Sequence, residues 1–162
     1  MERSLILACG NTLRGDDGVG SRIAGQLEQD ASLSGLEIHL SQQLLPEMSE
    51  PVSRADMVIF VDCSAVQEAG IVSVQRVEPA PSLPRIFTHH LDPSSILRMA
   101  IDYYGCCAPE AFAVTVGGSD FSLSEDLSEI VALAVPRAVL ATKELLLSAR
   151  PSPSVASGIA CE

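Results

Sequence analysis

Two adjacent aspartates, Asp16 and Asp17, stand in a glycine-rich loop that follows the apolar run Leu5–Cys9. One aspartate at the start of a helix is typical of an N-cap, and we expect one of the pair to cap the helix that begins near Val19. A cap needs only one carboxylate, so the second aspartate is left without a role in capping. Carboxylates at the end of a buried strand often bind metals or transfer protons, so the pair predicts such a role for one of them.

A third acid and two histidines extend this candidate set. Asp62 ends the apolar run Met57–Val61, and His89 and His90 precede a helix expected from Pro93. Carboxylate oxygens together with imidazole nitrogen suit Zn²⁺ or Ni²⁺. Because adjacent residues of an extended segment point in opposite directions, we expect only one of the two histidines to face the site.

Strands and helices alternate along the chain. We expect strands at Ser4–Cys9, Leu36–Leu40, Met57–Val61, Gly70–Val77 and Phe112–Val116, and helices at Gly18–Gln29, Pro46–Arg54, Pro93–Tyr104 and Glu125–Leu147. On the last helix we expect a buried face formed by Ile130, Leu133, Ala134, Ala138 and Leu145. Such alternation predicts an α/β fold with a parallel sheet that helices cover on both faces.

The usual strand orders of such sheets place the first and third strands side by side. The loop after Cys9 then lies next to the end of Val61. Asp17 and Asp62 are 45 positions apart in the chain, yet this topology predicts that they meet at one crevice.

The 162 residues suit one domain, which we expect at 1–147, followed by a flexible tail at 148–162. No apolar run is long enough to span a bilayer, and the net charge of −11 argues against nucleic acid and anionic membranes as partners. The five cysteines are odd in number and lack Cys-x-x-Cys spacing, which indicates reduced thiols and a cytoplasmic protein.

Four segments of the chain resemble one family. Gly10–Gly20 is similar to the signature loop of the [NiFe]-hydrogenase maturation proteases, also called hydrogenase maturation endopeptidases (peptidase family A31). Val58–Cys63 resembles the acid-ended third strand of that family, Thr88–Leu97 its histidine segment, and Leu127–Arg137 its final helix.

The resemblance implies a three-layer α/β/α sandwich around a five-stranded, mostly parallel sheet. It also implies a metal site made of Asp17, Asp62 and His89, with His90 as the fallback for the histidine. The activity implied is that of an endopeptidase, with Asp17 and Asp62 as its catalytic residues. Such an enzyme removes the C-terminal extension of a [NiFe]-hydrogenase large subunit after nickel insertion.

The resemblance makes the hydrogenase large subunit the partner and nickel the metal. The nickel is expected to arrive with the substrate, and other divalent ions such as zinc are expected to fit the same ligands. The protein itself is expected to be a monomer. The segment Gln42–Glu47 replaces a Gly-Gly-Thr-type loop of many members, and we expect it to border the crevice.

Two other functions fit part of the pattern. A nickel-sensing chaperone that does not cut would use the same ligands. A receiver domain also gathers acids after its first and third strands, but it needs a lysine after the fifth strand. The only lysine here is Lys143, within the last expected helix, and Gly117 and Gly118 follow the fifth strand.

Overall fold

A computed structural model describes residues 3–33, 35–83 and 91–148. The predicted histidine ligands, His89 and His90, lie outside the described residues. The predicted tail at 148–162 also lies outside them, except for Ser148, which ends the last helix.

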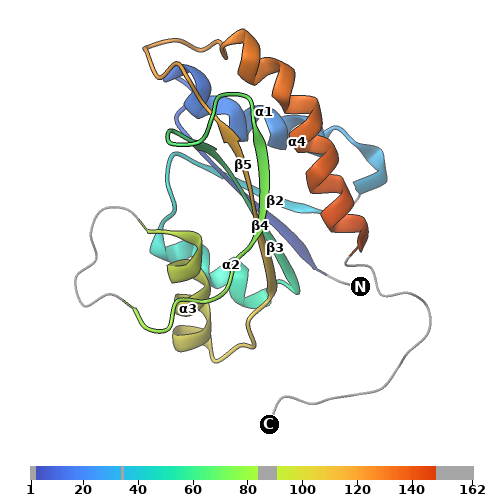
Figure 1. The fold of residues 1–162 in the computed structure, drawn as a ribbon. Coiled ribbons are helices and arrows are strands. Elements are labelled where there is room, and N and C mark those ends of the chain that lie inside the picture. The colour runs from blue at the N-terminus through green and yellow to red at the C-terminus, as the bar shows by residue number, and fades with distance from the viewer. Residues whose placement is uncertain (1–2, 34, 84–90, 149–162) are drawn as a thin grey trace.

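The centre of the fold is a five-stranded sheet in the order β2-β1-β3-β5-β4 (Figure 1). The strands are β1 (Ser4–Cys9), β2 (Glu37–Ser41), β3 (Met57–Ser64), β4 (Val72–Arg76) and β5 (Glu110–Gly117). Neighbouring strands are parallel except for β4, which runs antiparallel to β5 at one edge. The mostly parallel sheet and the adjacency of β1 and β3 are both confirmed.

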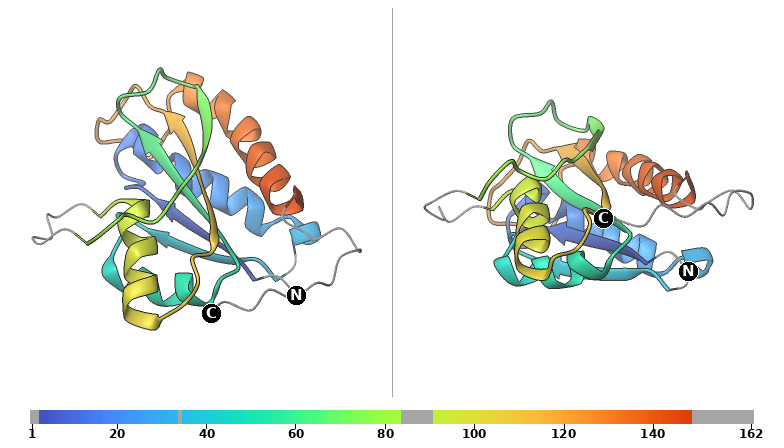
Figure 2. Two further views of the ribbon diagram at one scale, coloured as in Figure 1. Left: turned by 60° about the horizontal axis from the view of Figure 1, so that its bottom comes forward. Right: turned by 90° about the horizontal axis from the view of Figure 1, so that it is seen from below.

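Helices cover both faces of this sheet. They are α1 (Val19–Glu28), α2 (Ser49–Arg54), α3 (Pro93–Tyr104) and α4 (Glu129–Ser148), with short 3₁₀ turns at Gly15–Gly18, Ala31–Leu33 and Pro46–Met48. α1 and α4 pack together on one face, and α2 and α3 on the other, as Figures 1 and 2 show. The three-layer α/β/α sandwich is therefore confirmed.

The two layers of helices enclose two separate cores, because successive side chains of a strand point to opposite faces. Ile6, Ala8, Ile59 and Val61 belong to the core under α1 and α4. Leu5, Leu7, Val58 and Phe60 belong to the core under α2 and α3. Leu5–Cys9 in β1 and Met57–Val61 in β3 are unbroken apolar runs because helices cover both faces of these strands.

Strand β3 continues three residues beyond its predicted end. Its pairing with β5 runs on through Asp62 opposite Thr115 to Ser64 opposite Gly117. Asp62 is consequently a strand residue whose side chain is fixed by the pleat of the sheet, and not the first residue of a loop.

The predicted buried face of α4 is partly wrong. Ala134 and Ala138 are fully buried, but Ile130 is 48% exposed and Leu133 is 69% exposed. The side chains that face the sheet and α1 include Val131, Val135 and Leu146 instead. Because α4 carries apolar residues on nearly every side, periodicity alone does not select the face that the sheet covers.

Helix α3 begins and ends as its sequence predicts. The Asp92 carboxylate accepts a hydrogen bond from the Ser95 backbone N–H at 2.7 Å, which makes Asp92 the N-cap, and Pro93 occupies the first turn. Gly105 ends the helix with φ at 63°, a left-handed conformation that glycine adopts without strain. No helix within the described ranges is both long enough and apolar enough to cross a membrane.

Candidate active site at the carboxyl edge of the sheet

The loop that leaves β1 folds back tightly on itself. Gly10 has φ at 134°, and a Cβ atom at this position would lie 1.8 Å from the backbone oxygen of Asp17. Only glycine fits there. The turn lets the Asn11 backbone N–H donate to Asp17 Oδ2 at 2.7 Å, which fixes the Asp17 carboxylate beside the end of β1.

Asp16 lies inside the protein and does not cap α1, which corrects the prediction that one aspartate of the pair is an N-cap. Neither α1 nor the preceding 3₁₀ turn has a side-chain cap. Asp16 is fully buried, and its carboxylate accepts backbone hydrogen bonds from Ser119 at 2.8 Å, Asp120 at 2.9 Å and Ser128 at 2.7 Å. The Ser128 hydroxyl adds a bond of 2.9 Å.

These bonds decide the ionisation of Asp16. Burial by itself raises the pKa of a carboxyl group, but the hydrogen bonds from Ser119, Asp120 and Ser128 outweigh it and hold the pKa of Asp16 below its ordinary value of 3.8. Asp16 is thus a buried carboxylate that joins the first loop to the segment between β5 and α4.

Asp62 lies at the carboxyl end of β3, on the face that α2 and α3 cover. It borders a cleft of about 520 Å³ with a largely apolar floor. Leu7, Cys9 and Phe60 reach the cleft from β1 and β3, Thr115 from β5, Arg76 from β4, and Ser94 from the start of α3. Leu44 also lines it, which confirms the prediction that the Gln42–Glu47 loop borders the crevice.

Asp17 lies close enough to Asp62 for its negative charge to act on the Asp62 carboxyl group. Asp62 is exposed to the solvent of the cleft, yet protein atoms replace much of the water around its carboxyl group. This burial, together with the negative charge of Asp17, outweighs the lowering by the hydrogen bond from the Cys63 backbone N–H and raises the pKa of Asp62 to about 6. Asp62 therefore changes its charge near neutral pH.

Two thiols lie near this pair, and both stay protonated at neutral pH. Burial and the negative charges of Asp62 and Asp17 raise the pKa of Cys9 to about 12, and burial with the same charges raises that of Cys63 to about 12. Cys63 points to the opposite face of the sheet from Asp62, against the core under α1 and α4, as predicted. Neither thiol is activated to act as a nucleophile, although Cys9 lines the cleft.

The structure also shows which cysteines carry free thiols. Cys9, Cys63 and Cys106 carry free thiols. Cys107 is disulfide-bonded, so the prediction that all five cysteines are reduced is wrong.

The metal ligands are only partly placed by the structure. Asp62 lines the cleft and Asp17 lies near enough for its charge to act on Asp62, whereas His89 and His90 lie outside the described residues. Within the part of the chain that the structure describes, no group of three or more His, Cys, Asp or Glu side chains is arranged to hold a metal ion. His39 lies on the edge strand β2 and bonds Glu37 at 2.7 Å, in keeping with its predicted place at the surface.

Sequence reasoning missed the role of Asp16 and most of the cleft lining. The partners of Asp16 are more than 100 positions away, at Ser119, Asp120 and Ser128, so no local pattern marks them. The only available signal was the presence of one carboxylate more than a cap requires. Arg76 and Thr115 reach the cleft through strand order, which spacing does not disclose.

No family model matches this sequence, and no curated protein does. The fold, by contrast, is similar to solved structures. The hydrogenase maturating endopeptidase HybD from E. coli is 21% identical, with a TM-score of 0.72 over 91% of this chain and 94% of that one. The [NiFe] hydrogenase maturation protease HycI from Thermococcus kodakarensis KOD1 is 23% identical, with a TM-score of 0.67 over 90% and 92% of the two chains.

A hydrogenase 2 maturation peptidase from Thaumarchaeota archaeon SCGC_AB-539-E09 shows the same similarity, at 22% identity and a TM-score of 0.66, over 90% of this chain and 98% of the other. The resemblance predicted from four sequence segments is thereby confirmed at the level of the fold. The chain has the three-layer architecture of these maturation endopeptidases over about nine-tenths of its length.

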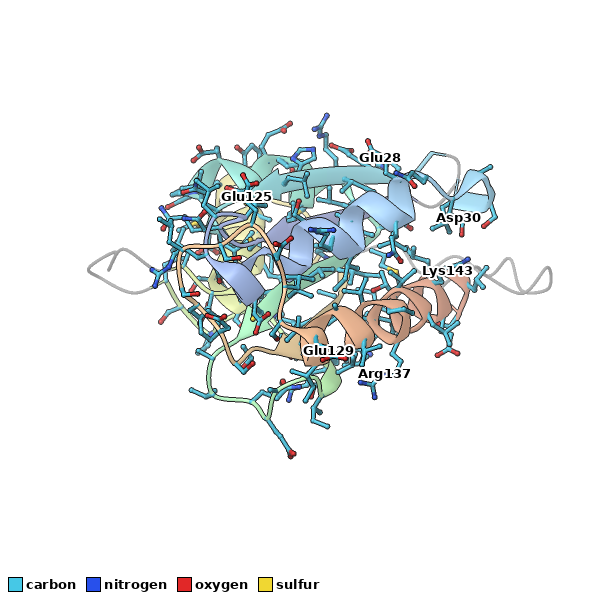
Figure 3. The ribbon with its side chains drawn as sticks, turned by 90° about the horizontal axis from the view of Figure 1, so that it is seen from above. Glu28, Asp30, Glu125, Glu129, Arg137 and Lys143 are labelled. Carbon is cyan, nitrogen blue, oxygen red and sulfur yellow. The ribbon has the colours of Figure 1, made fainter. Side chains whose placement is uncertain are left out.

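A receiver-domain function does not fit this arrangement. A receiver domain needs a lysine near its acid pocket, and the only lysine of the chain is Lys143. Lys143 reaches from α4 to Asp30 beyond the end of α1, as Figure 3 shows, and forms an ion pair with it. The cleft beside Asp62 therefore has no lysine.

Proposed function

We propose that this chain is a hydrogenase maturation endopeptidase. In this proposal it cuts the C-terminal extension from a [NiFe]-hydrogenase large subunit after nickel has been inserted. The observation that supports it most is the cleft beside Asp62, with the charge of Asp17 acting on Asp62, in the fold that the solved maturation endopeptidases share. His89 stays the predicted third ligand, with His90 as its fallback.

The metal of this proposal belongs to the substrate. Two carboxylates and an imidazole leave coordination positions open, as suits an ion that arrives already bound to another protein. Asp17 and Asp62 would face the nickel and add its missing contacts. Zinc or another divalent ion would fit the same ligands when nickel is absent.

In this proposal, the side chains of the protein act by acid–base catalysis when the peptide bond is cleaved. A general base works best when its pKa lies near the working pH, and the pKa of Asp62, about 6, meets this condition. We assign Asp62 as the proton acceptor for the attacking water and Asp17 as the carboxylate that orients the metal. The apolar floor of the cleft would hold the peptide on one side of the scissile bond.

Two exposed leucines on neighbouring loops provide an apolar surface that a folded protein substrate could contact. Leu13 and Leu123 are 49% and 89% exposed at the tips of two loops that are joined by backbone hydrogen bonds. Gly15 N–H donates to Ser124 O at 2.7 Å, and Ser124 N–H donates to Leu13 O at 3.1 Å. Leu13 belongs to the same loop as Asp17, and we infer that these two exposed leucines contact the folded substrate.

The decisive experiment compares two forms of one substrate. Purified protein is incubated with nickel-loaded and nickel-free large subunit, and the mass of each is followed. We expect the loaded form alone to lose its C-terminal extension, and a synthetic peptide of the extension to stay uncut. Cutting of both forms at equal rates would show an endopeptidase that does not recognise the metal.

A nickel-sensing chaperone that does not cut is the second candidate, because the same ligands serve it. It predicts a stable complex with the nickel-loaded large subunit and no change in the mass of either protein. The same incubation therefore distinguishes the two functions.

A further inference from the structure

Helix α4 carries a line of apolar side chains that the described chain leaves largely exposed. Leu133, Leu140 and Leu147 are seven residues apart and are 69%, 57% and 53% exposed. Ile130, three residues before Leu133, is 48% exposed. These four account for a third of the twelve large apolar residues that are exposed within the described ranges.

The line lies on the far side of α4 from the sheet. At about 100° per residue, its members are centred roughly 180° away from the buried side chains Val131, Val135 and Thr142. α4 is thus apolar on two opposite faces, and the sheet and α1 account for only one of them. A surface helix in contact with one neighbour needs an apolar stripe on one side only.

The spacing on this outer face is that of helix pairing. Six residues on this face follow one another at alternating intervals of three and four positions, and we call them the α4 stripe. They are Ile130, Leu133, Arg137, Leu140, Glu144 and Leu147. This heptad pattern places side chains along one seam of a helix that packs lengthwise against a second helix. The 20 residues of α4 provide about 30 Å of such a seam.

We propose that the α4 stripe pairs with the α4 stripe of a second copy of this chain, with the two helices antiparallel. The pairing makes the protein a twofold dimer, in place of the monomer expected from sequence. Identical stripes related by a twofold axis are the commonest arrangement in homodimers.

The charges within the stripe select this orientation. A parallel pair would set Arg137 against Arg137 and Glu144 against Glu144, which is repulsive at both positions. In an antiparallel pair, Ile130 lies beside Leu147 of the second copy. Arg137 then lies about one helical turn from Glu144 of that copy, so that opposite charges attract.

The surroundings of the stripe leave room for this partner. Arg137 donates one hydrogen bond to Gly70 O at 2.7 Å and is an exposed residue, and Ile130 also lies against Gly70 at one end of the stripe. Figure 3 shows Arg137 on the side of α4 away from α1, and Lys143 on the side toward it. The cleft with Asp62 lies on the opposite face of the sheet, under α2 and α3, so the dimer keeps it open.

The test measures the mass of the full chain in solution by sedimentation equilibrium between about 1 and 100 µM at physiological salt. We expect a dimer whose dissociation constant is on the order of micromolar. Leu140→Glu and Leu133→Glu should each weaken it at least about tenfold, since each places a charge in the seam. Leu123→Glu, the same change at an exposed loop residue, should leave the dimer intact.

A charge exchange tests the contact itself. Glu144→Arg and Arg137→Glu should each be mostly monomeric, and an equimolar mixture of the two variants should recover dimers. Circular dichroism and the melting temperature of each variant report whether α4 is still folded.

A monomeric wild type at 100 µM would overturn the proposal. Dimers that survive both Leu140→Glu and Leu133→Glu would overturn it as well, because they would use another surface. The proposal would also be overturned if Leu123→Glu lost as much dimer as Leu140→Glu.

Discussion

Asp16 and Ser128, 112 positions apart, are joined by two hydrogen bonds. The Ser128 backbone N–H donates to Asp16 Oδ1 at 2.7 Å, and the Ser128 hydroxyl donates to Asp16 Oδ2 at 2.9 Å. Ser128 immediately precedes α4, so the first loop of the chain is tied to the start of its last helix.

The first prediction concerns Asp16→Asn. A helix cap would tolerate the change because asparagine keeps one oxygen, but here the new NH₂ group must face N–H donors of Ser119, Asp120 or Ser128. We expect the free energy of unfolding to fall by about 2–4 kcal/mol and the melting temperature by on the order of 10 °C. Thermal unfolding measures this. A loss as small as that of Ser32→Ala, an exposed control, would contradict the buried network.

The second prediction concerns acid unfolding. Because the pKa of Asp16 is lowered in the folded protein, its carboxylate stabilises the fold fully above the ordinary value of 3.8. The contribution is lost as the pH falls below that value toward the lowered pKa. Urea unfolding between pH 5 and about 2.5 should therefore show a steeper loss of stability for the wild type than for Asp16→Asn. Parallel curves for the two proteins would refute it.

The third prediction concerns Asp62, whose shift has the opposite sign. The folded protein holds its proton up to a pKa of about 6, so ionisation of Asp62 makes the fold less stable as the pH rises from 3.8 through 6. Asp62→Asn should be more stable than the wild type at pH 7, by less than about 1 kcal/mol because solvent screens this exposed group, and equal to it near pH 4. The same variant should process no large subunit.

Asp17 provides the fourth prediction, because its charge acts on Asp62. Asp17→Asn should abolish processing while the fold persists, since the Asp17 side chain makes one hydrogen bond to the chain, from Asn11 N–H. It should also lower the pKa of Asp62, although burial keeps that pKa above 3.8. NMR titration of the Asp62 carboxyl measures the shift. An unchanged pKa would mean that the two acids are too far apart to hold one ion.

The fifth prediction concerns docking. Leu123→Glu should lower kcat/KM for nickel-loaded large subunit at least about tenfold if Leu13 and Leu123 contact the folded substrate. The reason is that a charge in an apolar contact loses its hydration. Tyr103→Glu, a comparable change at the far end of α3, should leave the rate unchanged. Equal rates for Leu123→Glu and the wild type would place the docking surface elsewhere.

The sequence by itself determined the architecture. β1 is apolar from Leu5 to Cys9 and is followed by Gly10, and β3 is apolar from Met57 to Val61, just before Asp62. Asp92, Pro93 and Gly105 bound α3 as local rules require. Such signals act within a few residues through backbone sterics and hydrogen bonding, so they survive without knowledge of the neighbours. The adjacency of β1 and β3, which brings Asp17 within electrostatic reach of Asp62, also followed from sequence, because the handedness of crossovers leaves few strand orders.

Only the tertiary structure decided which of the two adjacent aspartates is buried. Asp16 and Asp17 are the same residue type in the same loop, and they differ in that Ser119, Asp120 and Ser128 surround one of them. The buried face of α4 was decided in the same way, because the sheet covers Val131 and leaves Leu133 exposed. Both depend on contacts between distant segments, whose energies are absent from any local window of the chain.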